Sequence, residues 1–508
     1  MKLYSFLTKS LRILCVAIAG FLLLINLLYH SSVSYDGAEK NLVEFYLFRN
    51  VLLLCFAAAM VASAFFLKDY LVKIKEKHLF LVLAAAYVLM GIYLIGNVDH
   101  TLRADALSLS KAARELLNGV AAQRFVKGGY FYEYPHQLGL LLYQRFLYSL
   151  ANDPGISFLA NLGFVLGINY LIFKITDLVF ADRLANLIAI LMAFGFLPQF
   201  FFILFAYGTI PGLFFQLAAF YYGLRFCADH AWRHMIPAAL GGCMAVLLRQ
   251  NHLIGIIALG IYLLLDWMKK PSCRQMVFLT VLLLSVLLPG RCLTSHFLGE
   301  AKGAPPVLWV AMGTDLDNQV RGPGWYDGSN RRIFQSADYD SEAASRAGME
   351  KLEKNLQKIR ERPGEAAAFF LKKNVSQWCD PLFQSLWSGP LEDCGQYTKT
   401  PLLRSLYNKG FGEAILATVM KLYMLVFWGL CLVYLVQHGA DHTQWQLPFL
   451  LLVGGFLFHT VWEGKSQYIY PYLFGLIPFA AFALSDVFDR AESLLQKELD
   501  NEQEAECP

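Results

Sequence analysis

Three charged residues have the types and settings that permit chemistry at a membrane surface. Asp105 begins the segment ADALSLSKAARELL after its first alanine, Arg249 separates two apolar runs in LLRQNHLI, and Lys465 precedes a late apolar run in EGKSQYIYPY. A carboxylate can accept a proton from a hydroxyl as a general base, and cations in a low-dielectric cleft stabilise an oxyanion. A charge between apolar runs is costly in lipid, so Arg249 is a functional candidate. The structural alternatives are a helix cap for Asp105 and interfacial anchoring for the two cations.

The elements that must position these residues are membrane helices. The chain of 508 residues is 57% hydrophobic and 16% charged, with a mean hydropathy of +0.45, which is more apolar surface than one soluble core can bury. The stretch 136–151 carries Gln144 and Arg145, so it is either a poor span or an interfacial helix. We therefore predict an all-α polytopic membrane protein with about 12–13 transmembrane helices. The expected spans are 12–29, 48–67, 79–96, 156–179, 184–204, 207–227, 235–248, 251–267, 275–290, 413–436, 445–461 and 467–485.

Basic residues in short connections predict the orientation, because they favour the cytoplasmic side. They occur at the N-terminus, in KDYLVKIKEKH at 68–78 and in WMKKPSCR at 267–274. The first apolar run is expected to stay as a helix, with a cleaved signal peptide as the alternative. The predicted organisation is an N-terminal membrane region (1–290) with an outer loop at 97–135, a large outer loop (291–412), C-terminal membrane helices (413–485) and a cytoplasmic tail (486–508).

The first outer segment, 97–139, combines an amphipathic pattern with an aromatic cluster. Apolar residues 106, 109, 113 and 116 share one face of a helix that Asp105 is suited to start. The box YEYPHQLG follows, and its tyrosines have the alternative interpretation of an interfacial aromatic belt. Asp99 is a secondary carboxylate candidate, with a solvated loop residue as its alternative.

The second outer segment contains MGTDLDNQVRGPGWYDGSN and then a charged stretch that predicts one or two surface helices. The acidic triplets at 315–317 and 338–340 have a spacing that can bind a divalent cation, so a metal is left open and no cofactor is assigned. Cys379 and Cys394 share this loop, either as a disulfide or as free thiols. The net charge of +4 gives no sign of a nucleic-acid partner.

The motifs together resemble the membrane-embedded glycosyltransferases of the GT-C fold, in the branch of protein O-mannosyltransferases and the lipid A aminoarabinose transferase. The resemblance is closest to bacterial family-39-type members and covers most of the chain. It is carried by four motifs and one loop phrase, and Gln467 departs from it because many relatives have arginine there. The four motifs are RADALSLSKAARELLNG, YEYPHQLG, LLRQNHLI and EGKSQYIYPY, and the loop phrase consists of MGTDLDN and GPGWYDG.

The resemblance implies transfer of a sugar from a polyprenyl-phosphate donor to an acceptor at the outer face of a bacterial cytoplasmic membrane, with inversion. The leaving phosphate needs no general acid, so one carboxylate suffices, and Asp105 is the expected base. The implied acceptor is a cell-envelope polymer, a lipid or a protein. The alternatives are a surface-polysaccharide ligase or polymerase, or a lipid flippase or transporter. The residues implied to bind the donor phosphate or substrate are Arg249, Lys465, Tyr468, Tyr134, His136 and Gln137.

Overall fold

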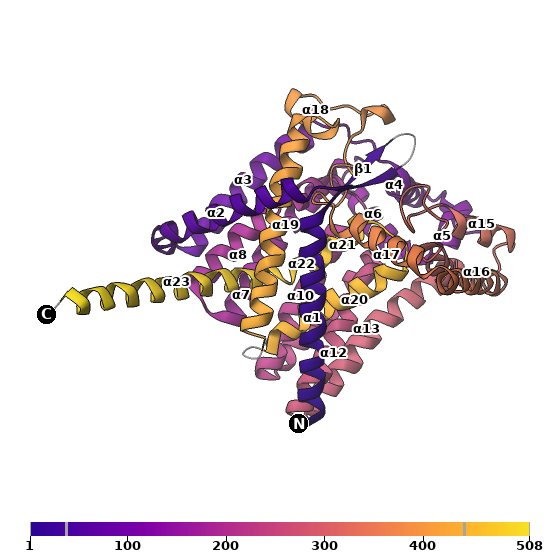
Figure 1. Cartoon of the computed structure of the whole chain (residues 1–508). Helices are drawn as coiled ribbons and strands as arrows, with labels where there is room; N and C mark the ends of the chain where they lie inside the picture. Colours follow the sequence, from indigo (N-terminus) through magenta and orange to yellow (C-terminus); the bar gives the residue numbers. More distant parts are fainter. Residues whose placement is uncertain (1, 36–38, 440–442, 507–508) are drawn as a thin grey trace.

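The computed structural model describes residues 2–35, 39–439 and 443–506, and these residues form a helical bundle with one two-stranded sheet (Figure 1). Every predicted apolar run is helical, because each offers a continuous apolar surface and internally satisfied backbone hydrogen bonds. The prediction of an all-α polytopic membrane protein is therefore confirmed. The helices of these runs are α1 (Lys2–Leu28), α2 (Leu47–Lys73), α3 (Glu76–Gly96), α7 (Gly155–Phe180), α8 (Arg183–Gly195), α10 (Thr209–Asp229), α11 (Trp232–Leu248), α12 (Leu253–Lys269), α13 (Cys273–Leu298), α19 (Phe411–Gln437), α20 (Gln446–Val461) and α23 (Ile477–Glu506).

Two of the predicted spans are bent. The run 184–204 consists of α8 followed by the short segment Pro198–Leu204 at 47°, and the run 467–485 consists of Ser466–Phe474 and α23 at 55°. Among the described residues, eight helices are long and apolar enough to cross a membrane, or ten if each bent pair is one span. The other two runs are α10, which contains polar residues such as Gln216, and α11, which has 17 residues.

The borderline stretch 136–151 forms α6 (Leu138–Leu150), which does not cross the bundle. Its 13 residues span only about 20 Å, short of about 30 Å of hydrocarbon. Asp153, just after α6, pairs with His100 at 2.6 Å, and Gly139 at its start lies against the C-terminal turn of α11. Both ends of α6 therefore lie at the end of the bundle where α3 and α11 end. Since α7 starts at this end, it runs in the direction opposite to α3.

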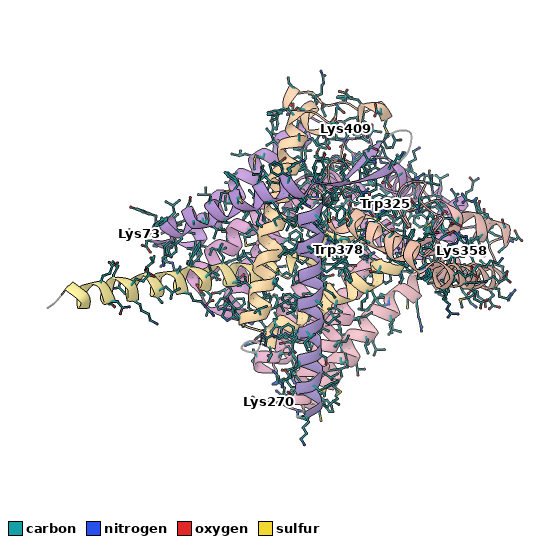
Figure 2. All side chains as sticks on the ribbon, in the orientation of Figure 1. Lys73, Lys270, Trp325, Lys358, Trp378 and Lys409 are labelled. Atoms are coloured by element: carbon teal, nitrogen blue, oxygen red, sulfur yellow. The ribbon has the colours of Figure 1, made fainter. Side chains whose placement is uncertain are left out.

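The predicted cytoplasmic turns gather at one end of the bundle, here called the basic end. Lys269 lies over the ring of Tyr4 at 5.1 Å, Arg12 donates to the carbonyl of Val436 at 2.6 Å, and Arg183 donates to the carbonyl of Ile74 at 3.3 Å. In Figure 2, Lys73 and Lys270 lie far from Lys358 and Lys409, which belong to the opposite, loop end.

The loop end is built from the segments 97–154 and 299–410. The second segment begins later than the predicted residue 291, because α13 continues through Pro289 to Leu298. The predicted charged surface helices are α16 and α17. Besides α6, the helices of this end are α4 (Ala104–Leu117), α5 (Tyr130–Glu133), α14 (Val307–Gly313), α15 (Ser329–Ser336), α16 (Ser341–Glu361), α17 (Pro363–Trp378) and α18 (Pro401–Tyr407).

A β-hairpin between α1 and α2 was not anticipated from the sequence. Strands β1 (Tyr29–Tyr35) and β2 (Glu39–Phe45) pair antiparallel. The hairpin is attached to the large loop, since the Ser31 amide donates to the carbonyl of Cys379 at 3.2 Å and the Asn41 amide to that of Arg321 at 2.7 Å. It therefore couples the N-terminal spans to the loop end.

The structure distinguishes between the alternatives left open for the loop cysteines and gives partners to the acidic triplets. Cys379 and Cys394 are both free thiols. Asp315 pairs with Lys351 at 3.2 Å and Asp317 with Lys358 at 2.6 Å. In the second triplet, Asp338 pairs with Lys127, and Asp340 caps α16 by accepting from the Ala343 amide. Within the part of the chain that the structure describes, no three His, Cys, Asp or Glu side chains form a metal-binding group.

Candidate functional site

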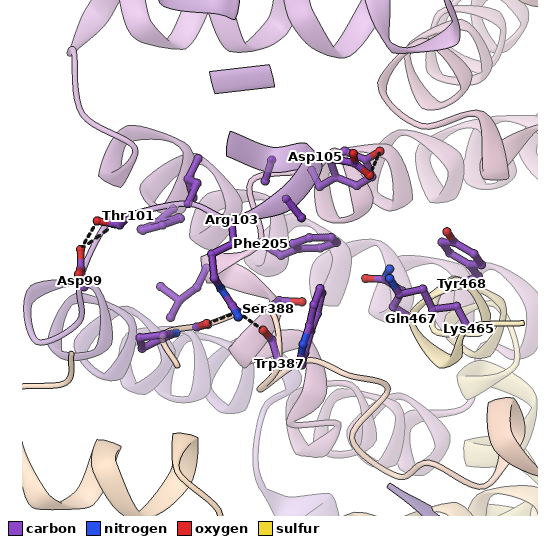
Figure 3. A pocket seen from close by; sticks show the side chains of 18 residues that line it. Asp99, Thr101, Arg103, Asp105, Phe205, Trp387, Ser388, Lys465, Gln467 and Tyr468 are labelled. Atoms are coloured by element: carbon purple, nitrogen blue, oxygen red, sulfur yellow. Dashed lines mark hydrogen bonds between the residues drawn. The ribbon is translucent and has the colours of Figure 1, made fainter. Parts of the chain in front are cut away.

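A cleft at the loop end brings together four segments that are far apart in the sequence (Figure 3). It holds about 700 Å³ of empty space, part of it open to solvent. The start of α4, the connection before α10, the loop after α17 and the start of the last bent span each contribute a wall. The lining residues with polar or aromatic side chains include Asp99, Thr101, Arg103, Asp105, Phe205, Tyr207, Trp387, Ser388, Lys465, Gln467 and Tyr468.

Asp105 lies in the first turn of α4, where the helix dipole favours a negative charge. Its side chain is exposed, and it accepts a hydrogen bond from the Tyr207 hydroxyl at 3.2 Å. The alternative interpretation as an N-cap is wrong, because Arg103 occupies the cap position and no side chain caps the helix. The predicted apolar face of α4 is buried at Ala106, Leu109 and Ala113.

The backbone just before Asp105 is held in an unusual conformation. Ala104 has a φ of +49°, in the left-handed region that is costly for a residue with a Cβ. Arg103 fixes this conformation, since its guanidinium donates to the carbonyl of Gly389 at 2.6 Å and also to that of Trp387. The loop after α17 therefore holds the start of α4, and with it the carboxylate.

Tyr207 links the carboxylate to the predicted phosphate-binding arginine. Its hydroxyl accepts from Gln137 Nε2 at 2.7 Å and its carbonyl accepts from Arg249 Nη1 at 3.1 Å. The next residue, Gly208, has a φ of +77°, and a Cβ there would meet the Leu248 carbonyl at 2.2 Å. Sequence reasoning missed Tyr207, although the helix break in FAYGTIPGLF was a signal.

Arg249 lies where α11 ends, in an extended backbone conformation. Its guanidinium lies 4.8 Å from the ring centre of Tyr207 and 5.6 Å from that of Tyr468. The Tyr468 carbonyl is held by Asn251 Nδ2 at 3.0 Å. Two aromatic faces therefore flank the cation. Both rings line the cleft, whereas Arg249 itself is half-buried next to them and is not one of the lining residues.

Lys465 lines the cleft but its charge is already paired. Its ammonium lies 2.9 Å from Glu39 Oε1, at the start of β2, and 5.0 Å from the ring centre of Trp387. The side chains of Lys465 and Glu39 are 13% and 7% exposed, so this ion pair is shielded from solvent. Sequence reasoning could not find Glu39 or Trp387, because both lie far from Lys465 in the sequence and only tertiary packing brings them to it.

The other residues of the YEYPHQLG box are not cleft residues. Tyr134 packs edge-on against Trp309 with ring centres 6.3 Å apart, and His136 packs against Tyr134 at 6.1 Å. The aromatic cluster is a packing element here, because Phe131 is fully buried and stacks on Phe125. Asp99 lines the cleft in a local turn, where it accepts from the amide and the hydroxyl of Thr101 at 2.8 and 2.7 Å.

Two buried ionisable groups support the loop that carries Lys465. Burial raises the pKa of Glu463 to about 7. The nearby Lys465 lowers this pKa, and the carboxylates of Glu39 and Asp105 raise it. Burial also lowers the pKa of Lys373 to about 7. The Lys373 ammonium donates to the carbonyls of Gly313 and Trp462 at 2.6 Å each, so α17 fixes the residue just before Glu463.

The fold and the cleft define a polytopic α-helical membrane protein with a polar cleft at the loop end of its bundle. A scan against protein-family models finds no match for the chain, and a search of curated proteins finds no relative. The functional assignment therefore rests on the residues of the cleft and on Arg249, which contacts two of its lining rings.

Proposed function

We propose that the protein is a membrane glycosyltransferase similar to the GT-C enzymes, which transfers a sugar from a polyprenyl-phosphate donor to an acceptor hydroxyl. The observation that carries this proposal is the exposed Asp105 carboxylate, joined through Tyr207 to the guanidinium of Arg249. This transfer requires a proton acceptor and a cation that binds phosphate, and here both candidate groups contact Tyr207.

In the proposed reaction, Asp105 takes the proton of the acceptor hydroxyl as its oxygen attacks the anomeric carbon. The bond from that carbon to the phosphate oxygen breaks on the opposite face, so the configuration inverts. The electron pair leaves with the phosphate, whose new negative charge is stabilised by Arg249. No general acid is required, since phosphate is a good leaving group.

The donor is proposed to carry one phosphate rather than the pyrophosphate of a polysaccharide ligase or polymerase. Arg103 is committed to two carbonyls and Lys465 to Glu39. Arg249 has no carboxylate partner among the described residues. Arg249 donates one hydrogen bond, to the Tyr207 carbonyl, and keeps further guanidinium donors for a ligand. One such cation matches the single charge of a phosphodiester better than the two charges of a pyrophosphate diester.

Transport is less well supported than transfer. A transporter is expected to place polar residues near the membrane midplane in broken helices. Here the cleft is walled by helix ends and loop segments. We place this end at the outer face of a bacterial cytoplasmic membrane, because the basic turns favour the cytoplasm at the opposite end.

The proposal is tested by incubating membranes that contain the protein with radiolabelled polyprenyl-phosphate sugars. Label should move from the lipid donor into an envelope polymer, a lipid or a protein, and the labelled fraction identifies the acceptor class. Membranes with the Asp105→Asn variant are the matched control. Equal labelling in both samples would remove Asp105 from the mechanism, and labelled donor that crosses the bilayer unreacted would favour a flippase.

A further inference from the structure

Lys465 joins three segments at the wall of the cleft. Its ammonium pairs with Glu39 of the hairpin, lies over Trp387 in the loop after α17, and belongs to the segment that precedes the last bent span. A second cation, the guanidinium of Arg103, also lies near the Trp387 indole, 5.2 Å from the ring centre. Trp387 is therefore held by two cations, of which one fixes the start of α4 and the other fixes the hairpin.

The hairpin side of this junction is itself anchored. The side-chain amide of Asn41 donates to the Ser31 hydroxyl at 2.7 Å and to the Ser376 carbonyl at 3.3 Å. On the lysine side, the Gly464 amide donates to the carbonyl of Gly324 at 2.8 Å. Both partners of the ion pair are thus attached to the large loop, and the ion pair closes the connection between them.

We infer that Lys465 is a positioning residue, paired with Glu39, that holds the Trp387 wall of the cleft in place and ties it to the hairpin, rather than a ligand of the substrate's phosphate. An ammonium already paired with a shielded carboxylate offers an incoming anion little net charge. Removing Lys465 leaves the Glu39 carboxylate buried without its ion-pair partner, and removing Glu39 leaves the ammonium with only the nearby Glu463 among the described carboxyl groups. Either change weakens the junction and opens it. The statement that Lys465 does not bind the donor phosphate rests on the proposed function, whereas the role of the Lys465–Glu39 ion pair in holding the junction does not.

The test measures how fast an impermeant maleimide labels a cysteine placed at Ser388, a half-buried residue of the cleft wall. It is done on the full-length protein in membranes, in a background without the accessible native cysteines. The variants are Glu39→Gln, Lys465→Met and the double variant. The matched control is Glu44→Gln, the same change at an exposed position of the same strand.

We expect Glu39→Gln and Lys465→Met each to speed labelling by roughly tenfold, as the population of the open junction rises. The double variant should label no faster than either single variant, because both remove one interaction. Lys465→Arg keeps the ion pair and the contact with the indole, so it should label at the wild-type rate, as should Glu44→Gln. The Arg variant also shows that residue 465 tolerates substitution without loss of folding.

The opposite assignment predicts opposite results. If Lys465 binds the phosphate and Glu39 only competes with it, Glu39→Gln should lower the donor KM and leave labelling unchanged, and that result would overturn our inference. Additive effects in the double variant would also overturn it. Because labelling needs no transfer reaction, an inactive donor assay with the expected labelling pattern would refute the proposed function and leave the positioning role intact.

Discussion

Replacing Asp105 by Asn separates catalysis from structure in one substitution. Asparagine keeps the size of the side chain, and its oxygen still accepts from the Tyr207 hydroxyl, but it cannot take a proton. Loss of a general base should lower turnover by about 100-fold or more, which corresponds to at least about 2.7 kcal/mol in the activation free energy.

The structural cost of this substitution is much smaller. Asp105 does not cap α4, so no cap is lost, and the first-turn charge contributes about 0.3–1 kcal/mol through the helix dipole. The retained hydrogen bond removes the larger penalty of an unsatisfied group. The expected increase in the activation free energy, at least about 2.7 kcal/mol, thus exceeds the expected decrease in the free energy of unfolding, about 0.3–1 kcal/mol.

The assay is single-turnover transfer from a radiolabelled polyprenyl-phosphate sugar, with thermal unfolding of the same preparation. Asp99→Asn is the control, since its turn bonds from Thr101 are available to asparagine and it should stay within about twofold of wild type. Normal transfer by a folded Asp105→Asn protein would refute the reasoning. An equal loss at Asp99 would instead make the two carboxylates a functional pair.

Three further predictions concern the phosphate site, the topology and the buried charges. Arg249→Ala should lose more donor use than Arg249→Lys, because a point charge partly replaces a guanidinium, and equal wild-type kcat/KM in both would make Arg249 an anchor. A cysteine at exposed Glu353 should react with an impermeant thiol reagent in intact cells, whereas native Cys273 at the basic end should not, and reversed labelling would invert the orientation. Glu463→Gln should stabilise the protein above pH 7 by at most about 3 kcal/mol and much less near pH 4.5. The reason is that the pKa of the buried carboxyl is raised, so its ionisation between these two pH values lowers the stability of the wild-type protein. Unfolding is measured across this pH range, and a difference between variant and wild type that does not change with pH would show that the carboxyl is not buried.

The positions of the membrane helices could be predicted because apolar length is a local property of the sequence. The start of α2 and the end of α3 agree with their predicted spans to within one residue. The bends were not visible, since hydropathy does not report where a helix changes direction, although Pro198 begins the second half of one bent run and Gly475 lies in the break of the other. The hairpin had a signal that was not used, the Asp-Gly pair at 36–37 between alternating residues.

The candidate site was only partly visible in the sequence. Asp105, Arg249 and Lys465 stood out because charges beside apolar runs are costly, whereas Tyr468 was found through the resemblance carried by EGKSQYIYPY. Their partners were not predictable, because the links from Arg103 to Trp387 and from Lys465 to Glu39 join segments hundreds of residues apart. Tertiary packing alone decides which cation stays available to a substrate.

The way Asp105 is held favours chemistry in place over movement of a substrate across the membrane. A transport site must change its walls during each cycle, and residues that move are joined by few fixed contacts. Asp105 follows a strained alanine, and Arg103 before it is bound to two carbonyls and one indole. Such strain persists only where the surroundings determine the conformation, and it fixes the direction in which the carboxylate points. A general base gains from that fixed direction, because proton transfer requires the carboxylate and the acceptor hydroxyl to meet at hydrogen-bond distance.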